Sequence, residues 1–225
     1  MESWILQLLK ETKETAEPTK PVQGSAEWLE KRRGLFTASE AYKLIGKDGN
    51  QTALTYCYQK AAERLGHYIP SSSSAAMNWG NELEKEAIEF YEEKANTIVQ
   101  AVSFEKHQTL PVGCSLDGLV LDGFIEVKCP YMPENVLKLI DYLRAVKDFK
   151  KSKKEYFWQV VCSFLVYPNL EYCDYIVYSG QLNKGFTKRI ERSSVLEEIL
   201  VLEEQVLHYE SVVQDVVTRN KDIFL

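Results

Sequence analysis

Several features that mark common protein classes are missing from this sequence of 225 residues. Its five cysteines are an odd number and include no CxxC pair, which disfavours a disulfide framework and also a zinc or iron–sulfur site. Its three histidines, at positions 67, 107 and 208, form neither an HxH nor an HExxH pattern, so a metal ion held by histidine has little support. We therefore expect the cysteines to be reduced, buried thiols and any metal ion to be bound by oxygen atoms.

A long apolar segment is also missing. The longest nearly apolar run, residues 157–167, contains Gln159 and Ser163 and is shorter than the roughly 20 residues that a membrane-spanning helix needs. The chain begins Met1-Glu2 without the basic residues that open a secretory signal. We therefore expect a protein of the reducing cytosol, with no membrane partner.

The chain has no excess of positive charge. Lysine and arginine total 27 against 33 aspartates and glutamates, a formal net charge of -6. A nucleic-acid partner would need positive charge gathered locally, because binding to phosphates is electrostatic. Residues 147–154 supply such a run, with the lysines Lys147, Lys150, Lys151, Lys153 and Lys154. A run of this kind is more often a solvated loop, and attraction of phosphate becomes the better interpretation beside a site that cleaves phosphodiesters.

What the sequence does contain suffices for one domain with a sizeable core, since 45% of its residues are hydrophobic. Apolar spacing predicts helices over 4–14, 54–66, 81–94, 134–147, 155–167 and 194–217, a short helix closed by Gly46, and strands over 97–106, 173–179 and 186–192. Together with a hairpin at 115–130, they predict an α/β (α+β) fold with a central mixed β-sheet flanked by helices. We expect a single domain over 1–225, with an N-terminal helix and linker at 1–24 and a loop at 68–80. That helix could pack on its own core or mediate assembly, and we favour the first.

The hairpin, SLDGLVLDGFIEVKCP, carries three charged residues among apolar ones. Asp122-Gly123 is a strong signal for a two-residue turn, which would pair residue 119 with 126 and residue 117 with 128. Because side chains alternate along a strand, Asp117, Glu126 and Lys128 then share one face. Asp117 would lie diagonal to Glu126, about 7 Å away between Cα atoms.

This charged face allows two interpretations. The two carboxylates can hold one Mg²⁺ or Mn²⁺ ion, with Lys128 orienting or deprotonating a water molecule or stabilising charge on a phosphate. Alternatively, Asp117 and Lys128 form an exposed salt bridge, which is common and contributes little to stability. The hairpin alone slightly favours the salt bridge.

Another carboxylate shifts the balance toward the metal ion. On the helix predicted from residue 81, Glu84 falls in line with the apolar residues, whereas Glu82, Glu86, Glu89 and Glu93 share the polar face. A carboxylate on the buried side needs a partner, and a shared metal ion supplies one. A half-exposed Glu84 is the alternative.

A polar stripe also interrupts the helix over 155–167, where Gln159 and Ser163 lie four residues apart among apolar residues. Such a stripe indicates either the border of a functional site or a satisfied polar network inside the core. The sequence favours neither of the two.

These residues occur in short motifs that resemble a known family. Asp117 followed by Glu126-Val127-Lys128 matches the D…(D/E)xK core of the PD-(D/E)XK nucleases, a weak pattern by itself. The motifs WLEKRRGLFTASE, WGNELEKEAIEFY, CSLDGLV, IEVKCP and YFWQVVCSF make it specific, because their order and approximate spacing resemble the lambda-exonuclease (YqaJ-like) viral recombinase family. The resemblance covers roughly residues 28–178 and implies a restriction-endonuclease-like core.

The resemblance implies a Mg²⁺-dependent, ATP-independent 5′-to-3′ exonuclease on linear double-stranded DNA with 5′-phosphorylated ends. Such an enzyme releases 5′-mononucleotides and leaves 3′ single strands for recombination. The resemblance further implies two metal ions, with Mn²⁺ as a substitute for Mg²⁺, and a ring-shaped homotrimer. It also implies a single-strand DNA annealing protein as partner and the cytoplasm of a host cell, for a phage or virus gene product.

By matching motif positions, the resemblance assigns a metal and catalytic group. Asp117 and Glu126 resemble the principal metal ligands, joined by the backbone carbonyl of Val127, while Glu84 serves the second metal region. Lys128 resembles the catalytic lysine.

The resemblance also assigns residues to DNA. Arg32 resembles the arginine that receives the terminal 5′-phosphate, with Arg33 as the weaker candidate, and Ser39, Glu40 and Gln159 match positions in the same cleft. Beyond the family pattern, the lysines Lys150, Lys151, Lys153 and Lys154 would add contacts to the duplex or change how subunits meet.

Two departures from the family pattern stand out. A second glutamine often follows two residues after Gln159, where this chain has Val161, and the lysine-rich segment is longer than the usual connection. A PD-(D/E)XK endonuclease, a RecB-like nuclease module and a catalytically silent DNA-binding protein are the alternatives. The missing cysteine cluster disfavours the iron–sulfur nucleases, and the joint presence of Asp117, Glu126 and Lys128 argues against a silent binder.

Overall fold

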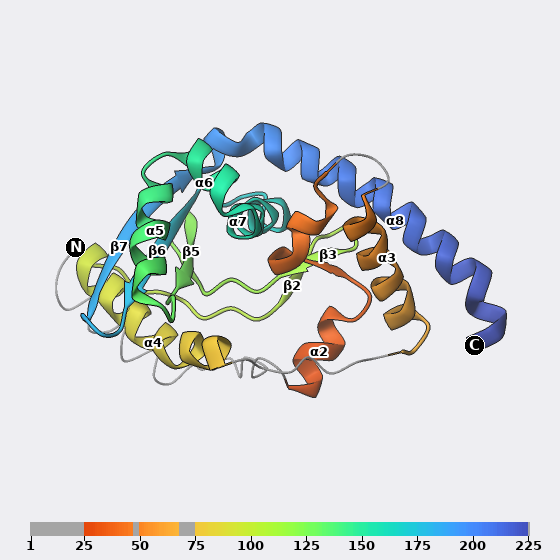
Figure 1. Ribbon diagram of the computed structural model, residues 1–225, viewed down its shortest axis with the longest axis horizontal. Coiled ribbons are helices and arrows are strands. Elements are labelled where there is room, and N and C mark those ends of the chain that lie inside the picture. Colours follow the sequence, from red (N-terminus) through yellow and green to blue (C-terminus); the bar gives the residue numbers. More distant parts are fainter. Residues whose placement is uncertain (1–24, 47–49, 68–74, 225) are drawn as a thin grey trace.

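The computed structural model describes residues 25–46, 50–67 and 75–224 (Figure 1). The helix and linker predicted at 1–24 lie outside the described residues, as do residues 68–74 of the predicted loop. The rest of that loop is helical, because α4 (Ala75–Ala95) begins at Ala75 rather than near residue 81. In the described part of the chain, no helix is both long and apolar enough to cross a membrane.

The strands form two sheets, where the sequence predicted one. The larger sheet has the order β4-β5-β6-β7, with β5 parallel to β6 and the outer pairs antiparallel, and the smaller has the order β1-β3-β2. The mixed α/β architecture with flanking helices is confirmed. The strands are β1 (Phe36–Thr37), β2 (Glu105–Lys106), β3 (Val112–Cys114), β4 (Gly118–Val120), β5 (Gly123–Lys128), β6 (Tyr172–Ser179) and β7 (Lys184–Glu191).

The strand predicted over 97–106 accounts for the division into two sheets. It is bridged to the larger sheet at one point, between Gln100 and Leu119, and joins the smaller sheet as β2. The segment between these two points runs from the larger sheet to the smaller one, so it does not form the continuous strand that the sequence predicted.

The helices mostly match the predicted ones, with shifted ends. The described helices are α2 (Ala26–Arg32), η1 (Ala38–Leu44), α3 (Gln51–Arg64), α4, α5 (Pro133–Leu143), α6 (Val146–Ser152), α7 (Lys154–Val166), η2 (Arg192–Val195) and α8 (Leu196–Phe224). The helix predicted over 134–147 is broken, because Ala145 is extended (φ -134°, ψ 125°) and separates α5 from α6. The short helix closed near Gly46 is the 3-10 helix η1, and the Thr37 side chain makes no capping hydrogen bond there.

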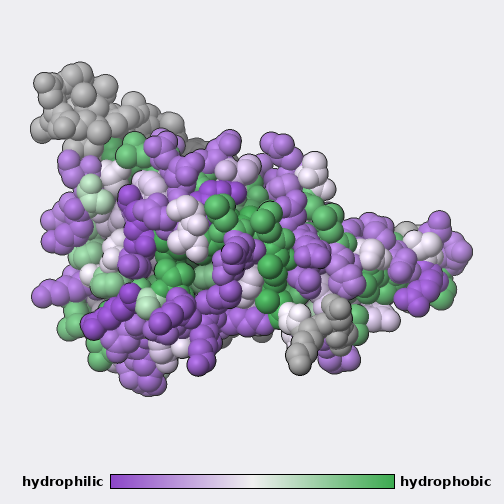
Figure 2. Space-filling view, turned by 90° about the horizontal axis from the view of Figure 1, so that it is seen from above, coloured by the Kyte–Doolittle hydropathy of each residue, from purple (hydrophilic) through white to green (hydrophobic). Residues whose placement is uncertain are grey.

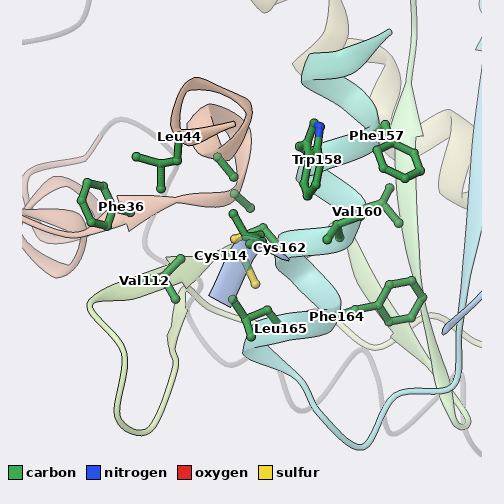
Figure 3. Packing of buried hydrophobic residues seen from close by; sticks show 14 of the residues in the cluster. Phe36, Leu44, Val112, Cys114, Phe157, Trp158, Val160, Cys162, Phe164 and Leu165 are labelled. Atoms are coloured by element: carbon green, nitrogen blue, oxygen red, sulfur yellow. The ribbon is translucent and has the colours of Figure 1, made fainter. Parts of the chain in front are cut away.

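Helix α7 lies at the centre of the main core. Figure 3 shows its residues Trp158 and Cys162 on the side of the smaller sheet and η1, which contribute Val112 and Leu44, whereas Phe157 and Phe164 point to the other side of the helix. Most of α7 is fully buried, which explains why its sequence is apolar on nearly every side. Helix α4 packs on the opposite face of the larger sheet, where Ala87 and Tyr91 join a second cluster. The five cysteines are all free, and four of them are buried, as predicted.

Candidate active site

The hairpin that carries the three charges turns one residue earlier than the sequence predicts. Val120 pairs with Gly123, so Leu121 and Asp122 form the turn, with Leu121 at a φ of 44°. The predicted Asp122-Gly123 turn is therefore wrong, and the pairing moves by two residues. Gly123 is needed in the strand itself, because a Cβ there would lie 2.4 Å from the Tyr172 ring.

A shift of two residues leaves every side chain on its predicted face. Leu119 now pairs with Phe124, and continuing this register places Asp117 opposite Glu126 rather than diagonal to it. Asp117 lies just before β4, and its Oδ2 accepts a hydrogen bond from the backbone N–H of Val127 at 2.7 Å. The carboxylate of Asp117 is thereby held against the strand that carries Glu126 and Lys128.

Glu126 is the most buried acidic residue of this group, with 1% of its surface exposed. Its Oε1 accepts hydrogen bonds from Lys128 Nζ and, at 2.6 Å, from Gln159 Nε2, whereas its Oε2 has no hydrogen-bond partner among the described residues. Burial, opposed by Lys128 and assisted by Asp117 and Glu84, raises the pKa of the Glu126 carboxyl to about 7. A buried carboxylate oxygen without a partner is unfavourable, and a cation would relieve it.

Lys128 forms its ion pair with Glu126, not with Asp117 as the salt-bridge interpretation assumed. Burial alone would lower the pKa of the Lys128 ammonium, but the Glu126 and Asp117 carboxylates outweigh it and raise that pKa. Lys128 Nζ also lies over the ring of Tyr156, 5.2 Å from the ring centroid, in a cation–π contact. Lys128 is thus held as a cation, which suits stabilisation of negative charge better than proton abstraction.

Glu84 lies where its position on the helix predicted. The glutamates of the predicted polar face, Glu82, Glu86, Glu89 and Glu93, are exposed, whereas Glu84 is half-buried and lines a cleft. Its charge contributes to the raised pKa values of Glu126 and Cys129, so its carboxylate faces the same space.

The three carboxylates supply the hard oxygen donors that Mg²⁺ and Mn²⁺ prefer. Within the described ranges, no three His, Cys, Asp or Glu side chains already stand close enough to surround an ion. The orphaned Oε2 of Glu126 nevertheless fits a divalent cation, because a cation would satisfy this oxygen and offset the unfavourable effect of the Asp117 charge on the Glu126 carboxylate.

A cleft of about 1320 Å³ brings most of the predicted site together. Its walls come from α2, η1, α3, α4, β3, α5, α7, residues 102–104 and the hairpin. Of the predicted residues, it is lined by Glu84, Asp117, Val127, Lys128, Arg32, Arg33, Ser39, Glu40, Lys153 and Gln159. Glu126 lies behind this lining and is reached through Lys128 and Gln159.

Arg32 is the arginine of the RRG motif with an unpaired guanidinium in the described part of the chain. It stacks on Trp28, 3.9 Å from the ring centroid, and lies 5.5 Å from that of Phe104, while burial lowers the pKa of its guanidinium. Arg33 instead forms an ion pair with Glu30 at 2.8 Å. Arg32 is therefore better placed to receive an anion.

Ser39 and Glu40 occupy the same end of the cleft on η1. Ser39 is exposed, and Glu40 forms an ion pair with Lys43. Glu40 also lies close enough to Arg32 to affect the pKa of its guanidinium. The structure thus groups Ser39 and Glu40 with Arg32, and their contact with DNA stays a prediction.

The lysine run covers most of α6, which ends at Ser152, then the non-helical Lys153 and the first residue of α7, Lys154. Its lysines differ in whether they reach the cleft. Lys153 lines the cleft, whereas Lys150 pairs with Glu198 of α8 at 2.6 Å and Lys154 donates to the carbonyl of Ile45. Lys151 is exposed outside the lining. The structure therefore brings one of the four predicted lysines to the cleft, and DNA contact by the others stays a prediction.

Sequence reasoning missed Lys60 and Tyr156, which also line the cleft. Lys60 is 6% exposed and pairs with Glu63 at 2.8 Å. The signal was available, because Lys60 falls among buried residues of α3 just as Glu84 does on α4. Tyr156 lies three residues before Gln159 on α7, which places both on one side of the helix.

The chain is similar to a family of known proteins and to several solved structures. It matches a family model described as the YqaJ-like viral recombinase domain over residues 27–167. A similar solved structure is that of an alkaline exonuclease, LHK-Exo, from Laribacter hongkongensis, with a TM-score of 0.74 and 28% identity over 88% of this chain and 97% of that chain.

Two further structures extend the comparison. LHK-Exo in complex with dAMP gives a TM-score of 0.74 and 27% identity over 88% of this chain and 98% of that one. A phage related exonuclease from Haemophilus somnus 129PT gives a TM-score of 0.60 over 80% of this chain and 96% of that one, and its 14% identity shows similarity of fold alone. No curated protein sequence matches the chain.

Proposed function

This chain belongs to the YqaJ-like viral recombinase family, and we propose that it is an exonuclease acting on the ends of linear double-stranded DNA. It digests the strand that ends in a 5′-phosphate, in the 5′-to-3′ direction and without ATP, and leaves a 3′ single strand. The observation that carries the proposal is the placement of Asp117, Glu84 and Lys128 in one cleft with Arg32. Carboxylates for a metal ion and a free arginine fork for a terminal phosphate are both needed for this activity.

Asp117, Glu126 and the carbonyl of Val127 would hold one Mg²⁺ or Mn²⁺ ion, and Glu84 faces the region of a second. Bound there, such ions lower the pKa of a water molecule and neutralise charge on the leaving 3′-oxygen. Hydrogen bonds from Gln159 and Lys128 fix Oε1 of Glu126 and leave Oε2 available on its other side. The protonated Lys128 supplies positive charge beside the phosphate that is cut.

Arg32 binds the terminal 5′-phosphate in this proposal. A guanidinium can donate to two phosphate oxygens at once, which a lysine ammonium does with less geometric specificity. The stacking of Arg32 on Trp28 orients the fork before DNA arrives. Preference for phosphorylated ends follows from this orientation.

Relatives support the release of mononucleotides. The solved alkaline exonuclease was crystallised in complex with dAMP, a deoxynucleoside monophosphate. A product of that kind is what stepwise hydrolysis from a 5′-phosphorylated end yields. The 3′ strand left behind would serve recombination with a single-strand DNA annealing protein, in the cytoplasm of the host cell of a phage or virus.

We further propose a ring-shaped homotrimer. Helix α8 exposes apolar side chains on one side, with Leu196 at 50%, Leu200 at 65% and Leu207 at 55% exposure. Figure 2 shows hydrophobic residues at the surface in the middle of the face seen from above, with the C-terminal end of α8 projecting to one side. An exposed apolar stripe on a helix of this length suits contact with another copy of the chain.

The deciding experiment is digestion of linear duplex DNA labelled at either end, with or without a 5′-phosphate, in Mg²⁺ and in EDTA. We expect the 5′ label to appear first, as a mononucleotide, in Mg²⁺ and on phosphorylated ends. Earlier loss of the 3′ label contradicts the polarity. Cleavage of covalently closed circles would indicate an endonuclease instead, and binding without any digestion would indicate a silent DNA-binding protein.

A further inference from the structure

The backbone that follows Arg32 forms a tight turn. The N–H of Leu35 donates to the carbonyl of Arg32 at 3.1 Å, Arg33 has φ -56° and ψ 128°, and Gly34 has φ +69°. These are the dihedrals of a type II β-turn, which needs a positive φ at its third residue. Arg32 is thus the first residue of a turn whose shape depends on Gly34.

Side chains from the end of α3 hold both backbone polar groups of Gly34. The N–H of Gly34 donates to Glu63 Oε2 at 2.7 Å. The carbonyl of Gly34 accepts from Arg64 Nε at 2.9 Å and from Arg64 Nη2 at 2.7 Å. Two consecutive residues of one helix, 29 and 30 positions away, therefore fix the donor and the acceptor of a single turn residue.

Other charged groups hold these two side chains in place. Arg64 binds both carboxylate oxygens of Glu210 on α8, at 2.6 Å and 2.8 Å, and each side chain is only about one-fifth exposed. Glu63 Oε1 accepts from Lys60 Nζ at 2.8 Å. Charge-assisted, bidentate bonds of this kind are among the stronger hydrogen bonds in proteins. A continuous path of contacts thus runs from α8 through α3 to the turn.

Among the described residues, the end of α2 is held through the turn and through β1 after it, where Phe36 is fully buried and its N–H donates to the carbonyl of Pro111 at 2.9 Å. None of the residues of α2 itself is fully buried, and Trp28, Leu29 and Arg32 are half-buried. The Arg32 guanidinium rests on Trp28, which belongs to the same helix, and more distantly on Phe104. A salt bridge that served only to join α3 and α8 would need no bonds to Gly34. The direction of Arg32 therefore depends on the turn that Glu63 and Arg64 hold.

We propose that Arg64, with Glu63 and Glu210, positions Arg32 through Gly34 and thereby sets the preference for 5′-phosphorylated DNA ends. The inference rests on the proposed function, in which Arg32 receives the terminal phosphate. Arg64 itself is a positioning residue, because its donors are directed to the Gly34 carbonyl and to Glu210. A displacement of about 1 Å at a binding group is enough to lower activity strongly.

The test compares Arg64→Met, Arg64→Lys and Val206→Ala. Arg64→Met keeps an apolar stem and removes every donor, whereas Arg64→Lys keeps the charge but cannot serve Gly34 and both oxygens of Glu210 together. Val206 is fully buried on α8, so Val206→Ala lowers the melting temperature without altering the bonds to Gly34. kcat and KM are measured on duplexes with and without a 5′-phosphate.

For Arg64→Met we expect the KM of phosphorylated ends to rise about tenfold, with kcat within about twofold and unphosphorylated ends unaffected. Arg64→Lys should fall between this variant and the wild-type chain. Val206→Ala should keep the wild-type ratio between the two kinds of end. Retention of the full ratio by Arg64→Met, or its loss in Val206→Ala, would overturn the inference.

A second measurement separates this inference from the proposed function. Affinities of the same variants for both duplexes are measured in EDTA by fluorescence anisotropy, where no digestion is required. If the wild-type chain digests nothing, the proposed function fails, and the affinities still decide whether Arg64 controls phosphate recognition. If the wild-type chain binds both ends equally, Arg32 does not read the phosphate and the inference fails with it.

Discussion

Gln159 Nε2 donates to Glu126 Oε1 across 2.6 Å, so the central helix α7 holds the carboxylate of β5. Ser163, one turn further along, donates instead to the backbone carbonyl of Gln159 at 3.1 Å and is 1% exposed. The polar stripe therefore has both of the meanings that the sequence left open. Gln159 borders the cleft, and Ser163 belongs to a network inside the core.

Replacing Gln159 by Leu should weaken the site without unfolding the protein. The variant leaves Glu126 Oε1 with Lys128 alone, so the carboxylate is held less firmly. We expect activity to fall about 10- to 100-fold and the Mg²⁺ concentration for half-maximal rate to rise, as for other partners of metal ligands. Ser163→Ala, on the same stripe, is the control and should leave the Mg²⁺ requirement unchanged; an equal effect of both changes would contradict the role of Gln159.

Replacing Asp117 by Asn should abolish the response to metal ions. An amide oxygen can still accept the hydrogen bond from Val127, so the hairpin keeps its shape while one negative charge is lost. We expect activity to fall about 10³-fold, since a metal ion contributes several kcal/mol and each 1.36 kcal/mol is tenfold in rate. Activity measured during titration with Mg²⁺ or Mn²⁺ after EDTA treatment shows whether the response to metal ions is lost.

The same variant gives a readout that does not depend on turnover. An ion at about ten times its Kd should stabilise the wild-type chain by ~1.4 kcal/mol, and this gain should vanish in Asp117→Asn. Asp122→Asn, in the exposed turn of the same hairpin, makes the same change of charge and should keep the full gain. A thermal shift that persists in Asp117→Asn would exclude this carboxylate as a ligand.

The charged face of the hairpin was predictable because side chains alternate along a strand, so an error of two residues in the pairing leaves each side chain on the same face. The sequence places the turn at Asp122-Gly123, yet Gly123 is required within the strand beside Tyr172, and the resulting shift by two residues preserves the face. Glu84 was predictable because a carboxylate interrupts an apolar face. Both inferences use periodicity within one element.

Contacts between distant elements were not predictable in this way. Glu210 binds Arg64 across 146 positions in the sequence. Neither charged residue interrupts an apolar face of its own helix, so the sequence pattern does not indicate the contact. The break between α5 and α6 at Ala145 and the crossing between the two sheets depend likewise on tertiary packing rather than on local preference. The sequence therefore indicates which groups could reach the cleft but not what holds them there.

Replacing Gly34 by Ala should destabilise the fold more than the same change at Gly66. Both glycines have positive φ, +69° and +91°, but a Cβ at Gly34 would lie 2.6 Å from Arg64 Cγ, whereas nothing lies within 4 Å at Gly66. We expect a loss of about 3 kcal/mol at Gly34, from strain plus overcrowding, against about 1 kcal/mol at Gly66. Urea unfolding of both variants measures the difference, and equal losses would show that the turn tolerates displacement of Arg64.

Replacing Leu200 by Glu should disrupt the proposed trimer. Leu200 is 65% exposed on α8 beside Leu196 and Leu207, and a carboxylate there would be costly to bury between subunits. Leu182→Glu, at a site 69% exposed between β6 and β7, is the matched control. Light scattering should show monomers for Leu200→Glu and the wild-type mass for Leu182→Glu; the same mass for both would remove α8 from the interface.

Replacing Arg32 should change which DNA ends are preferred. Arg32→Lys keeps the positive charge but loses the planar fork and much of the stacking on Trp28, so it tests geometry rather than charge. We expect the ratio of kcat/KM for phosphorylated over unphosphorylated ends to fall about tenfold, since a charged hydrogen bond contributes about 1.5–3 kcal/mol. Arg33→Lys, next to it and paired with Glu30, should keep the wild-type ratio. A lower ratio in Arg33→Lys alone would assign phosphate recognition to Arg33. If Arg32→Lys instead lowers kcat/KM equally on both kinds of end, Arg32 attracts DNA in general and does not recognise the end.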